Sequence, residues 1–368
     1  MRAVITGGGT AGHINPALAV AQELRACGHE VSYAGTPQGL EARLVAQEGF
    51  PYTAFAATGF NRRKPLTLLA SSARVALSTL RARRWLAAVR PQVVVGFGGY
   101  VSIPVGLAAS QMRIPLAIHE QNSTSGMANR FLARHAQLVA LAYGSAACGF
   151  KTKGAVETVG NPVRASLFEA DKATARAAFG LPQDATVLLA FGGSLGARHL
   201  NEALVSQAGF LLSVHGLHIL HVTGTRDYDE TAAALAQLPS AAGRWHLVGY
   251  CDRMGEAYAA ADAVLSRAGA TTLAELGALG MPALLVPYPY AAADEQTANA
   301  RALVDAGAAA LLADDELDTP AFIERLTPFL LDGGYRASLT RAALAHGNAQ
   351  ARQTLARLVA ELAERHGA

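Results

Sequence analysis

Short runs of apolar residues alternate along this chain with longer segments in which apolar residues recur every three or four positions. Residues 2–6 form the first apolar run, residues 16–27 the first segment of helical spacing, and residues 30–34 the second run. This alternation is typical of βαβ units, in which helices bury both faces of a parallel sheet. We therefore predict an α/β fold of doubly wound parallel sheets, with strands at 2–6, 30–34, 93–96, 115–119, 138–142, 187–191, 219–223, 246–249, 263–266 and 283–287.

The strand series begins twice, and each first strand runs into a glycine-rich turn. These turns are Gly7–Gly12 and Gly192–Gly196 in a chain of 368 residues, a length that suits two cores. We predict two Rossmann-like domains that face each other across a cleft. The proline of Asn161-Pro162 disfavours helix at the residue before it, which favours a domain boundary here. The predicted domains are therefore 1–162 and 163–340. The alanine-rich segment 336–365 predicts one helix, and the end of the chain, 341–368, can then pack back on the N-terminal domain.

The composition excludes several classes of protein. Apolar residues make up 51% of the chain and charged residues 16%, which argues against disorder. A net charge of +3 is too small to indicate a nucleic-acid partner. The three cysteines have no CxxC spacing and favour a reducing compartment. We expect a cytoplasmic protein whose membrane contact is peripheral, because we find neither a signal sequence nor an apolar stretch of about 18 residues.

The first glycine-rich turn can bind either a dinucleotide or a simpler diphosphate. Gly7, Gly9 and Gly12 match the GxGxxG pattern, but the second strand ends at 33–36 without the acid that would hold a ribose. A nicotinamide oxidoreductase is therefore the less favoured class. The turn supplies backbone N–H groups at a helix start, where the dipole attracts anions. His13 follows directly, and it either accepts a proton from a hydroxyl nucleophile or only packs the loop.

Further polar motifs follow other strands at the sheet edge where ligands bind in open α/β folds. Gly98-Gly99-Tyr100 follows one strand and His119–Asn122 ends the next, and these groups suit sugar hydroxyls unless they only fix loops. In the second half, the turn 267–272 precedes the helix of Glu275, and its N-terminal amides would neutralise a leaving diphosphate without a metal. Glu275 then contacts a ribose or only pairs with the helix dipole.

Two other patterns bear on metals. Asp227-Tyr228-Asp229 has the DxD spacing of metal-dependent sugar transferases, but we assign it to a solvated loop. The histidines show no ligand spacing. We therefore predict neither a metal nor another cofactor.

Charge is distributed unevenly along the first domain. Residues 49–119 contain no Asp or Glu but nine basic residues. Within this segment Leu66, Leu69, Ala73, Leu77 and Leu80 recur at helical spacing, and Trp85 follows. The segment predicts either a helix that lies on an anionic bilayer or a core-facing helix with a solvated basic face.

Together, these motifs resemble those of the MurG family, bacterial N-acetylglucosaminyltransferases that convert lipid I to lipid II in peptidoglycan synthesis. The resemblance spans nearly the whole chain and is carried by Gly7–His13 with Pro16, Gly98–Ser102, His119–Asn122, Val159–Arg164, Gly192–Ala197 and Arg267–Glu275. It implies a GT-B fold, inverting transfer from UDP-GlcNAc to the MurNAc 4-hydroxyl of lipid I, and no metal. It also implies attachment to the cytoplasmic face of the membrane. The nearest alternative is a GT-B enzyme acting on another lipid, such as diacylglycerol, and a third is a non-catalytic sensor of nucleotide sugars.

The resemblance also implies roles for individual residues. His13 is the first candidate for the base that deprotonates the acceptor, and Glu120 the second. The implied donor contacts are Thr10, Ala11, Gly12, Asn122, Arg164, Ser194, Cys251, Ala270, Thr271, Thr272, Leu273, Ala274, Glu275 and Gln296. The implied contacts with the lipid I diphosphate are Gly9, Gly12, Gly98, Gly99 and Tyr100. The implied membrane contacts are Leu66, Leu69, Leu77, Leu80, Arg81, Arg84 and Trp85.

Three positions depart from the family pattern. Ala11 stands where glycine is frequent, Cys251 where a larger aliphatic residue is common, and Glu295 where histidine often precedes the glutamine. None of them removes a group that the implied mechanism requires.

Overall fold

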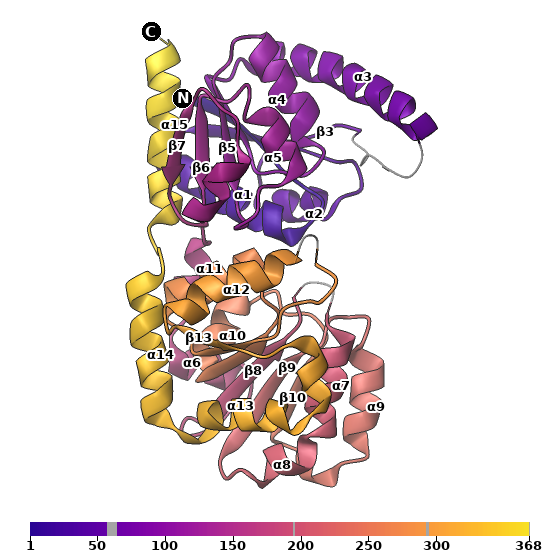
Figure 1. Cartoon of the computed structure of the whole chain (residues 1–368), viewed down its shortest axis with the longest axis vertical. Coiled ribbons are helices and arrows are strands. Elements are labelled where there is room, and N and C mark those ends of the chain that lie inside the picture. Colours follow the sequence, from indigo (N-terminus) through magenta and orange to yellow (C-terminus); the bar gives the residue numbers. More distant parts are fainter. Residues whose placement is uncertain (57–64, 194–195, 292–293, 368) are drawn as a thin grey trace. The chain divides into compact units, whose positions relative to one another are not determined.

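The computed structural model describes residues 1–56, 65–193, 196–291 and 294–367, with side chains in the third helix from Ser72 onward. The chain divides into two compact units (Figure 1). Unit 1 comprises Met1–Arg164 and Gln350–Ala368, and unit 2 comprises Ala165–Ala349. Each unit is built on one parallel sheet, which confirms the predicted fold class.

The sheet of unit 1 has seven parallel strands in the order β3-β2-β1-β4-β5-β6-β7. The strands are β1 (Arg2–Thr6), β2 (Glu30–Gly35), β3 (Tyr52–Ala54), β4 (Val93–Gly96), β5 (Leu116–Glu120), β6 (Leu138–Leu141) and β7 (Ala155–Thr158). The helices are α1 (Ala11–Ala26), α2 (Leu40–Gln47), α3 (Pro65–Val89), α4 (Ser102–Gln111), α5 (Met127–Leu132) and α15 (Ala351–Gly367). The order reverses between β1 and β4, so the loops after β1, β4 and β5 lie together at one edge.

Unit 2 has six parallel strands in the order β10-β9-β8-β11-β12-β13. The strands are β8 (Thr186–Phe191), β9 (Leu217–Val222), β10 (Trp245–Val248), β11 (Ala263–Ser266), β12 (Ala283–Leu285) and β13 (Ala309–Leu311). The helices are α6 (Lys172–Ala178), α7 (Arg198–Ser206), α8 (Ala208–Ser213), α9 (Tyr228–Ala236), α10 (Met254–Ala260), α11 (Ala270–Leu279), α12 (Glu295–Asp305), α13 (Pro320–Leu331) and α14 (Gly333–His346). The reversal between β8 and β11 brings together the loops that follow those strands, and one of these loops is the predicted diphosphate turn 267–272.

Helices bury both faces of each sheet, as the apolar strands predict. In unit 1, one core joins the sheet to α1 and α15, while the other joins it to α3, α4 and α5. In Figure 1, α15 runs beside α1 as the last, yellow element of this unit. The helix is held there by buried Leu355 and Val359 and by an ion pair of 2.6 Å between Arg352 Nε and Glu23 Oε2.

Several element boundaries differ from the prediction. The first helix begins at Ala11 instead of residue 16, because the Thr10 carbonyl accepts hydrogen bonds from the His13 and Ile14 amides. The strands β3, β7 and β13 span only three or four residues each, and the sequence did not predict them. The single helix predicted over 336–365 is wrong. The helix ends at His346 and a second helix, α15, begins at Ala351. Between them Gly347 packs so closely on the Gly277 backbone that a Cβ on Gly347 would collide with it.

Candidate active site

Two glycines after β4 allow the second turn of unit 1 to lie directly against the first. Gly98 has a φ of +90° and Gly99 a φ of +77°, a region that side chains disfavour. A Cβ on Gly99 would collide with the carbonyl oxygen of Gly8. The hydroxyl of Ser102 secures the turn by donating to the Gly98 carbonyl at 2.6 Å. The predicted acceptor turns are therefore packed into one surface at the carboxyl edge of the sheet.

His13 stands between these two turns in the first turn of α1. Its Nδ1 lies 3.1 Å from the Gly8 carbonyl oxygen and 3.2 Å from Thr10 Oγ1. A carbonyl can only accept, so Nδ1 carries the proton and the Nε2 lone pair is left available. Nε2 faces Gly98, where an added Cβ would lie 3.1 Å away. Burial lowers the pKa of His13, with the Glu120 carboxylate opposing that shift, so the ring is a neutral base near pH 7.

Glu120 is buried at the end of β5 and accepts from donors on both carboxylate oxygens. The backbone nitrogen of Asn122 lies 3.2 Å from Oε1. The backbone nitrogen of Gly126 and the side-chain Nδ2 of Asn129 each lie 2.9 Å from Oε2. Asn129 also donates to the His119 carbonyl at 3.0 Å. This set of donors suits a fixed charge that orients its neighbours better than it suits a base. The sequence did not single out Asn129.

The sequence predicts that Gly9 contacts a diphosphate, but in the structure the Gly9 N–H binds a carboxylate of the protein. The Gly9 N–H donates to Glu41 Oε2 at 3.3 Å, and Glu41 was not predicted to belong to the site. Gly12 and Thr10 lie beside His13 at the start of α1, and Tyr100 is exposed. Because the Gly9 N–H already donates to Glu41, the N–H groups at the start of α1 are better placed to bind an anion.

In unit 2, α11 begins directly after Gly269, at the end of the turn that follows β11. Glu275 lies one turn into this helix, where Tyr258 of α10 donates to its Oε2 at 2.8 Å. Both side chains are buried. The carboxylate therefore has a fixed orientation, and Tyr258 is a site residue that the sequence pattern did not reveal.

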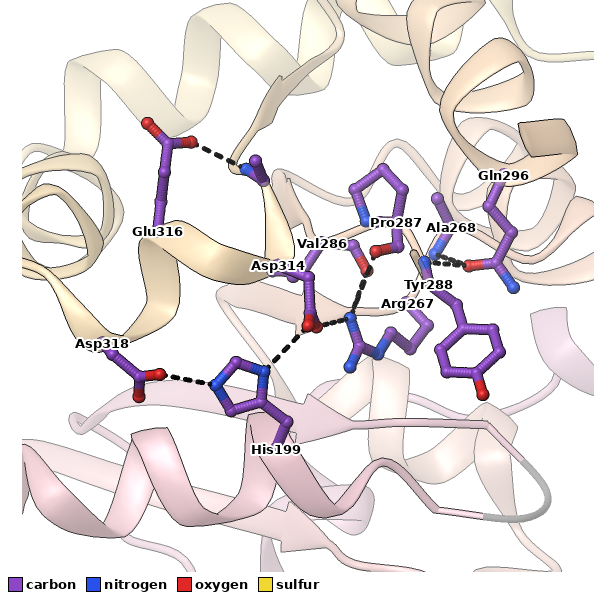
Figure 2. A network of polar contacts seen from close by, with 11 residues as sticks. His199, Arg267, Ala268, Val286, Pro287, Tyr288, Gln296, Asp314, Glu316 and Asp318 are labelled. Atoms are coloured by element: carbon purple, nitrogen blue, oxygen red, sulfur yellow. Dashed lines mark hydrogen bonds and ion pairs between the residues drawn. The ribbon is translucent and has the colours of Figure 1, made fainter. Parts of the chain in front are cut away.

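The carbonyl of Gln296 connects two loops of unit 2. Its Oε1 accepts from the Ala268 amide at 3.2 Å and from the Tyr288 amide at 2.9 Å (Figure 2). The turn after β11 is thereby joined to the loop after β12. Among the described residues the Gln296 amide nitrogen has no hydrogen-bond partner, which leaves two donors for a sugar.

Arg267 forms the centre of the network in Figure 2. It is 7% exposed, forms an ion pair with Asp314 through Nη1, and donates from the same nitrogen to the Val286 and Pro287 carbonyls at 3.2 Å each. His199 of α7 reaches the same aspartate from the other side, at 2.8 Å through Nδ1. The two carbonyl contacts of Arg267 therefore fix the end of β11 against the end of β12, and its ion pair with Asp314 ties both to the segment after β13, next to the predicted diphosphate turn.

His199 contacts carboxylates with both ring nitrogens, since Nε2 also lies 3.0 Å from Asp318 Oδ2. Ionised carboxylates only accept, so both nitrogens are protonated and the ring is an imidazolium. Burial alone would lower the pKa of His199, but the hydrogen bonds with Asp314 and Asp318 outweigh it and the pKa is raised.

Replacing Asp314 with alanine is expected to destabilise unit 2 and weaken donor binding, because it leaves a buried guanidinium without its partner. Loss of one partner of a buried pair costs about 3–5 kcal/mol. Chemical denaturation and the KM for the donor measure the two effects. Asp318→Ala is the matched control, since the Asp318 side chain is 72% exposed. Equal effects of the two substitutions would contradict a special role for the Asp314 pair.

The assignment of Asp227-Tyr228-Asp229 to a solvated loop is wrong, because Tyr228 and Asp229 begin α9 and Asp227 is buried. Asp227 is 2% exposed and is not solvated, because it accepts from Asn201 at 3.2 Å and from Arg226 at 3.1 Å. Among the residues that the structure describes, no cluster of His, Cys, Asp or Glu is placed to hold a metal ion.

The remaining predicted residues take their places as follows. Cys251 is partly buried beside the exposed Tyr250, and burial raises the pKa of its thiol. Arg164 ends unit 1 and its Nε is buried. Thr271 Oγ1 is also buried in the first turn of α11, near Ala270, Thr272, Leu273 and Ala274. Ser194, and the side chains of Leu66 and Leu69, lie outside the described residues.

Known proteins resemble this chain over its whole length. The N-terminal domain of glycosyltransferase family 28 matches residues 3–141, and its C-terminal domain matches residues 187–355. A relative from Halothermothrix orenii is 39% identical across 99% of this chain and 100% of its own. Another from Salinibacter ruber is 42% identical across 99% and 97%. Both are named UDP-N-acetylglucosamine--N-acetylmuramyl-(pentapeptide) pyrophosphoryl-undecaprenol N-acetylglucosamine transferase.

A solved structure agrees with these relatives. The crystal structure of Acinetobacter baumannii MurG is 32% identical, covers 98% of this chain and 99% of its own, and superposes with a TM-score of 0.75. The chain belongs to the MurG family of glycosyltransferases.

Membership of the MurG family confirms the expected GT-B glycosyltransferase. A more distant structure, the UDP-GlcNAc 2-epimerase from Neisseria meningitidis, is 15% identical with a TM-score of 0.68 over 98% of this chain and 100% of its own. At that identity it shows a shared fold alone. The glycine turns of both units fall within the matched family 28 domains, as do Glu120, Glu275 and Gln296.

Proposed function

We propose that this glycosyltransferase moves N-acetylglucosamine from UDP-GlcNAc to the MurNAc 4-hydroxyl of lipid I, forming a β1,4 linkage and releasing UDP and lipid II. The relatives' names give this donor and this acceptor. The geometry that best supports the proposal is that of His13, whose Nδ1 is held by the Gly8 carbonyl of the first glycine turn and whose proton-accepting Nε2 faces Gly98 of the second.

The donor is assigned to unit 2. The N-terminal N–H groups of α11 are suited to a diphosphate, because the helix dipole is positive at that end. Glu275, oriented by Tyr258, accepts from the ribose hydroxyls, and the amide nitrogen of Gln296 donates to the sugar. The backbone at Cys251 takes the uracil. The leaving UDP gains its charge stabilisation from fixed dipoles, so no step depends on a metal.

The acceptor is assigned to unit 1. The lipid I diphosphate lies along the glycine turns near Gly12, Gly98 and Gly99, and His13 Nε2 removes the proton of the 4-hydroxyl as oxygen attacks the anomeric carbon. His13 remains oriented through the Gly8 carbonyl, which holds the Nδ1 proton. Glu120 stabilises the imidazolium that forms, since its carboxylate opposes the burial that lowers the pKa of His13.

We also propose that α3 lies on the cytoplasmic face of an anionic membrane. Leu77 is 53% exposed and Leu80 55%, although both belong to the apolar stripe that the alternative reading would place in the core. Buried Ala82 and Leu86 form the core-facing side instead. Arg81 and Arg84 are exposed, and half-buried Trp85 packs on Phe55 with ring centroids 5.4 Å apart. None of the described helices is long and apolar enough to cross a bilayer.

Replacing Arg81 and Arg84 with glutamine is expected to weaken vesicle binding roughly 30-fold, because each basic group contributes about 1 kcal/mol near an anionic surface. Sedimentation with vesicles containing an anionic phospholipid measures the effect. Arg357→Gln with Arg365→Gln is the matched control, since it removes the same charge from exposed positions of α15. Equal binding by both double variants would refute the α3 surface.

The proposed function is tested with the purified protein, UDP-GlcNAc and lipid I. We expect UDP release coupled to formation of lipid II, and weaker use of UDP-glucose. Transfer to diacylglycerol but not to lipid I would reassign the acceptor. Binding of UDP-GlcNAc without UDP release in the presence of lipid I would indicate a sensor.

A further inference from the structure

Glu41 is a buried carboxylate of unit 1 that the proposed reaction does not use. It lies in the first turn of α2 and is 0% exposed. Its Oε1 accepts from the Thr36 amide at 2.9 Å and the Thr36 hydroxyl at 2.6 Å, while Oε2 accepts from the Gly9 amide at 3.3 Å. A single side chain thus joins the loop after β2 to the glycine turn that precedes His13.

Three glycines leave room for this carboxylate. A Cβ on Gly8, Gly35 or Gly39 would collide with the Glu41 side chain. Gly8 and Gly35 have ordinary φ angles, so the need for glycine at these two positions comes from space and not from backbone conformation. The first glycine turn is therefore shaped in part by contact with Glu41, in addition to any role in binding an anion.

The surroundings of Glu41 keep it ionised. Burial by itself raises the pKa of the carboxyl, but the hydrogen bonds from Thr36 and Gly9 outweigh burial and the pKa is lowered. Tyr33 and Tyr52, from β2 and β3, face it as neutral groups whose pKa values are raised by burial and by the Glu41 charge. Their hydroxyls donate to the Gly7 carbonyl at 3.0 Å and the Thr36 carbonyl at 2.6 Å.

Gly8 transmits the position of Glu41 to the candidate base. A Cβ on Gly8 would collide with the Glu41 carboxylate, while the Gly8 carbonyl oxygen lies 3.1 Å from His13 Nδ1 and would collide with a Cβ on Gly99. A shift of the turn at Gly8 would therefore move His13 and the second glycine turn together. Such a shift would also change the direction of the Gly9 N–H, which now donates to Glu41 and is therefore not offered to a diphosphate.

We propose that Glu41 is a positioning residue for sugar transfer: it sets the conformation of the Gly7–Thr10 turn and thereby places His13 and selects the N–H groups that meet the acceptor diphosphate. The inference rests on the proposed function. It assigns Glu41 no contact with substrate, because its carboxylate is enclosed by Thr36, Gly9 and the three glycines.

The test compares Glu41→Gln with the wild-type protein and with Glu48→Gln, a control at the other end of α2. Glutamine keeps the size of the side chain but loses its charge and presents an N–H group to either Gly9 or Thr36. We expect kcat with lipid I to fall tenfold or more, since a displacement of about 1 Å can cost 10²-fold. The donor KM should stay within about twofold, because the donor contacts assigned to unit 2 are unchanged.

A pH profile separates positioning from a general loss of structure. The carboxylates that oppose the lowering of the His13 pKa by burial are Glu120 from β5 and Glu41 from α2. Removing the Glu41 charge should therefore move the acid limb of kcat/KM to lower pH, whereas Glu48→Gln should leave it in place. An unchanged kcat together with an unchanged acid limb in folded Glu41→Gln would overturn the proposal.

A second variant and a second measurement cover the remaining outcomes. If Glu41→Gln does not fold, Thr36→Val removes one hydrogen bond to the carboxylate, and an unchanged kcat in that variant would refute the proposal. An NMR titration of the His13 ring needs no turnover. If the wild-type protein transfers no sugar to lipid I, the proposed function fails, yet a downward shift of the His13 pKa in Glu41→Gln would still support the coupling and an unchanged value would refute it.

Discussion

Replacing His13 with alanine is expected to lower kcat by about 10² to 10⁴, the usual cost of losing a general base. The reason is the ring's orientation: Nδ1 holds its proton against the Gly8 carbonyl, so Nε2 is free to accept one. The pKa of His13 is lowered by burial, so the wild-type rate should persist below pH 6.5 and fall only where the ring becomes protonated. Steady-state assays with lipid I at saturating donor measure both effects.

His13→Asn distinguishes the base from a packing residue. The asparagine amide can still donate to the Gly8 carbonyl, but it offers no group that accepts a proton at neutral pH. We expect His13→Asn to be as inactive as His13→Ala, and His29→Ala, which alters a histidine near the N-terminus in the same unit, to be fully active. Substantial activity in His13→Asn would transfer the role of base to another group, with Glu120 as the next candidate.

Deleting residues 350–368 is expected to unfold unit 1. The deletion removes Leu355, Val359 and Leu362 from the core shared with α1, and each buried side chain of this size contributes about 1.5–3 kcal/mol. The sum of roughly 5–9 kcal/mol is comparable to the whole stability of a typical domain, about 5–15 kcal/mol. The ion pair of Arg352 with Glu23 is lost as well.

The two tryptophans allow each unit to be followed separately. Trp85 lies in unit 1 and Trp245 in unit 2. In a Trp245→Phe background, fluorescence should report an unfolded unit 1 after the deletion. In a Trp85→Phe background, unit 2 should unfold at its usual denaturant concentration. Arg357→Ala is the control on α15, because this residue is exposed. A deletion variant with an unchanged Trp85 transition would contradict the docking of α15.

Part of the candidate site was predictable from the sequence because it depends on local patterns. A glycine turn after an apolar run places Gly98 and Gly99 at the end of β4, and the run before His119 places Glu120 at the end of β5. The roles of Glu41, Asn129 and Tyr258 were not predictable in this way. Each acts on a residue from another element, and the sequence around it carries no sign of that partner.

The sequence by itself determined the two strand series, their glycine turns and the type of chemistry, because strand periodicity and turn conformation depend on neighbouring residues. Only the tertiary structure decided which polar groups are buried together. Examples are Glu41 beneath Gly8, Asp314 beside Arg267, and the burial of Asp227. It also decided that α15 packs on α1 and that Leu77 and Leu80 face outward. The physical reason is that burial and hydrogen-bond partners depend on which distant elements lie side by side, and local sequence does not encode that contact.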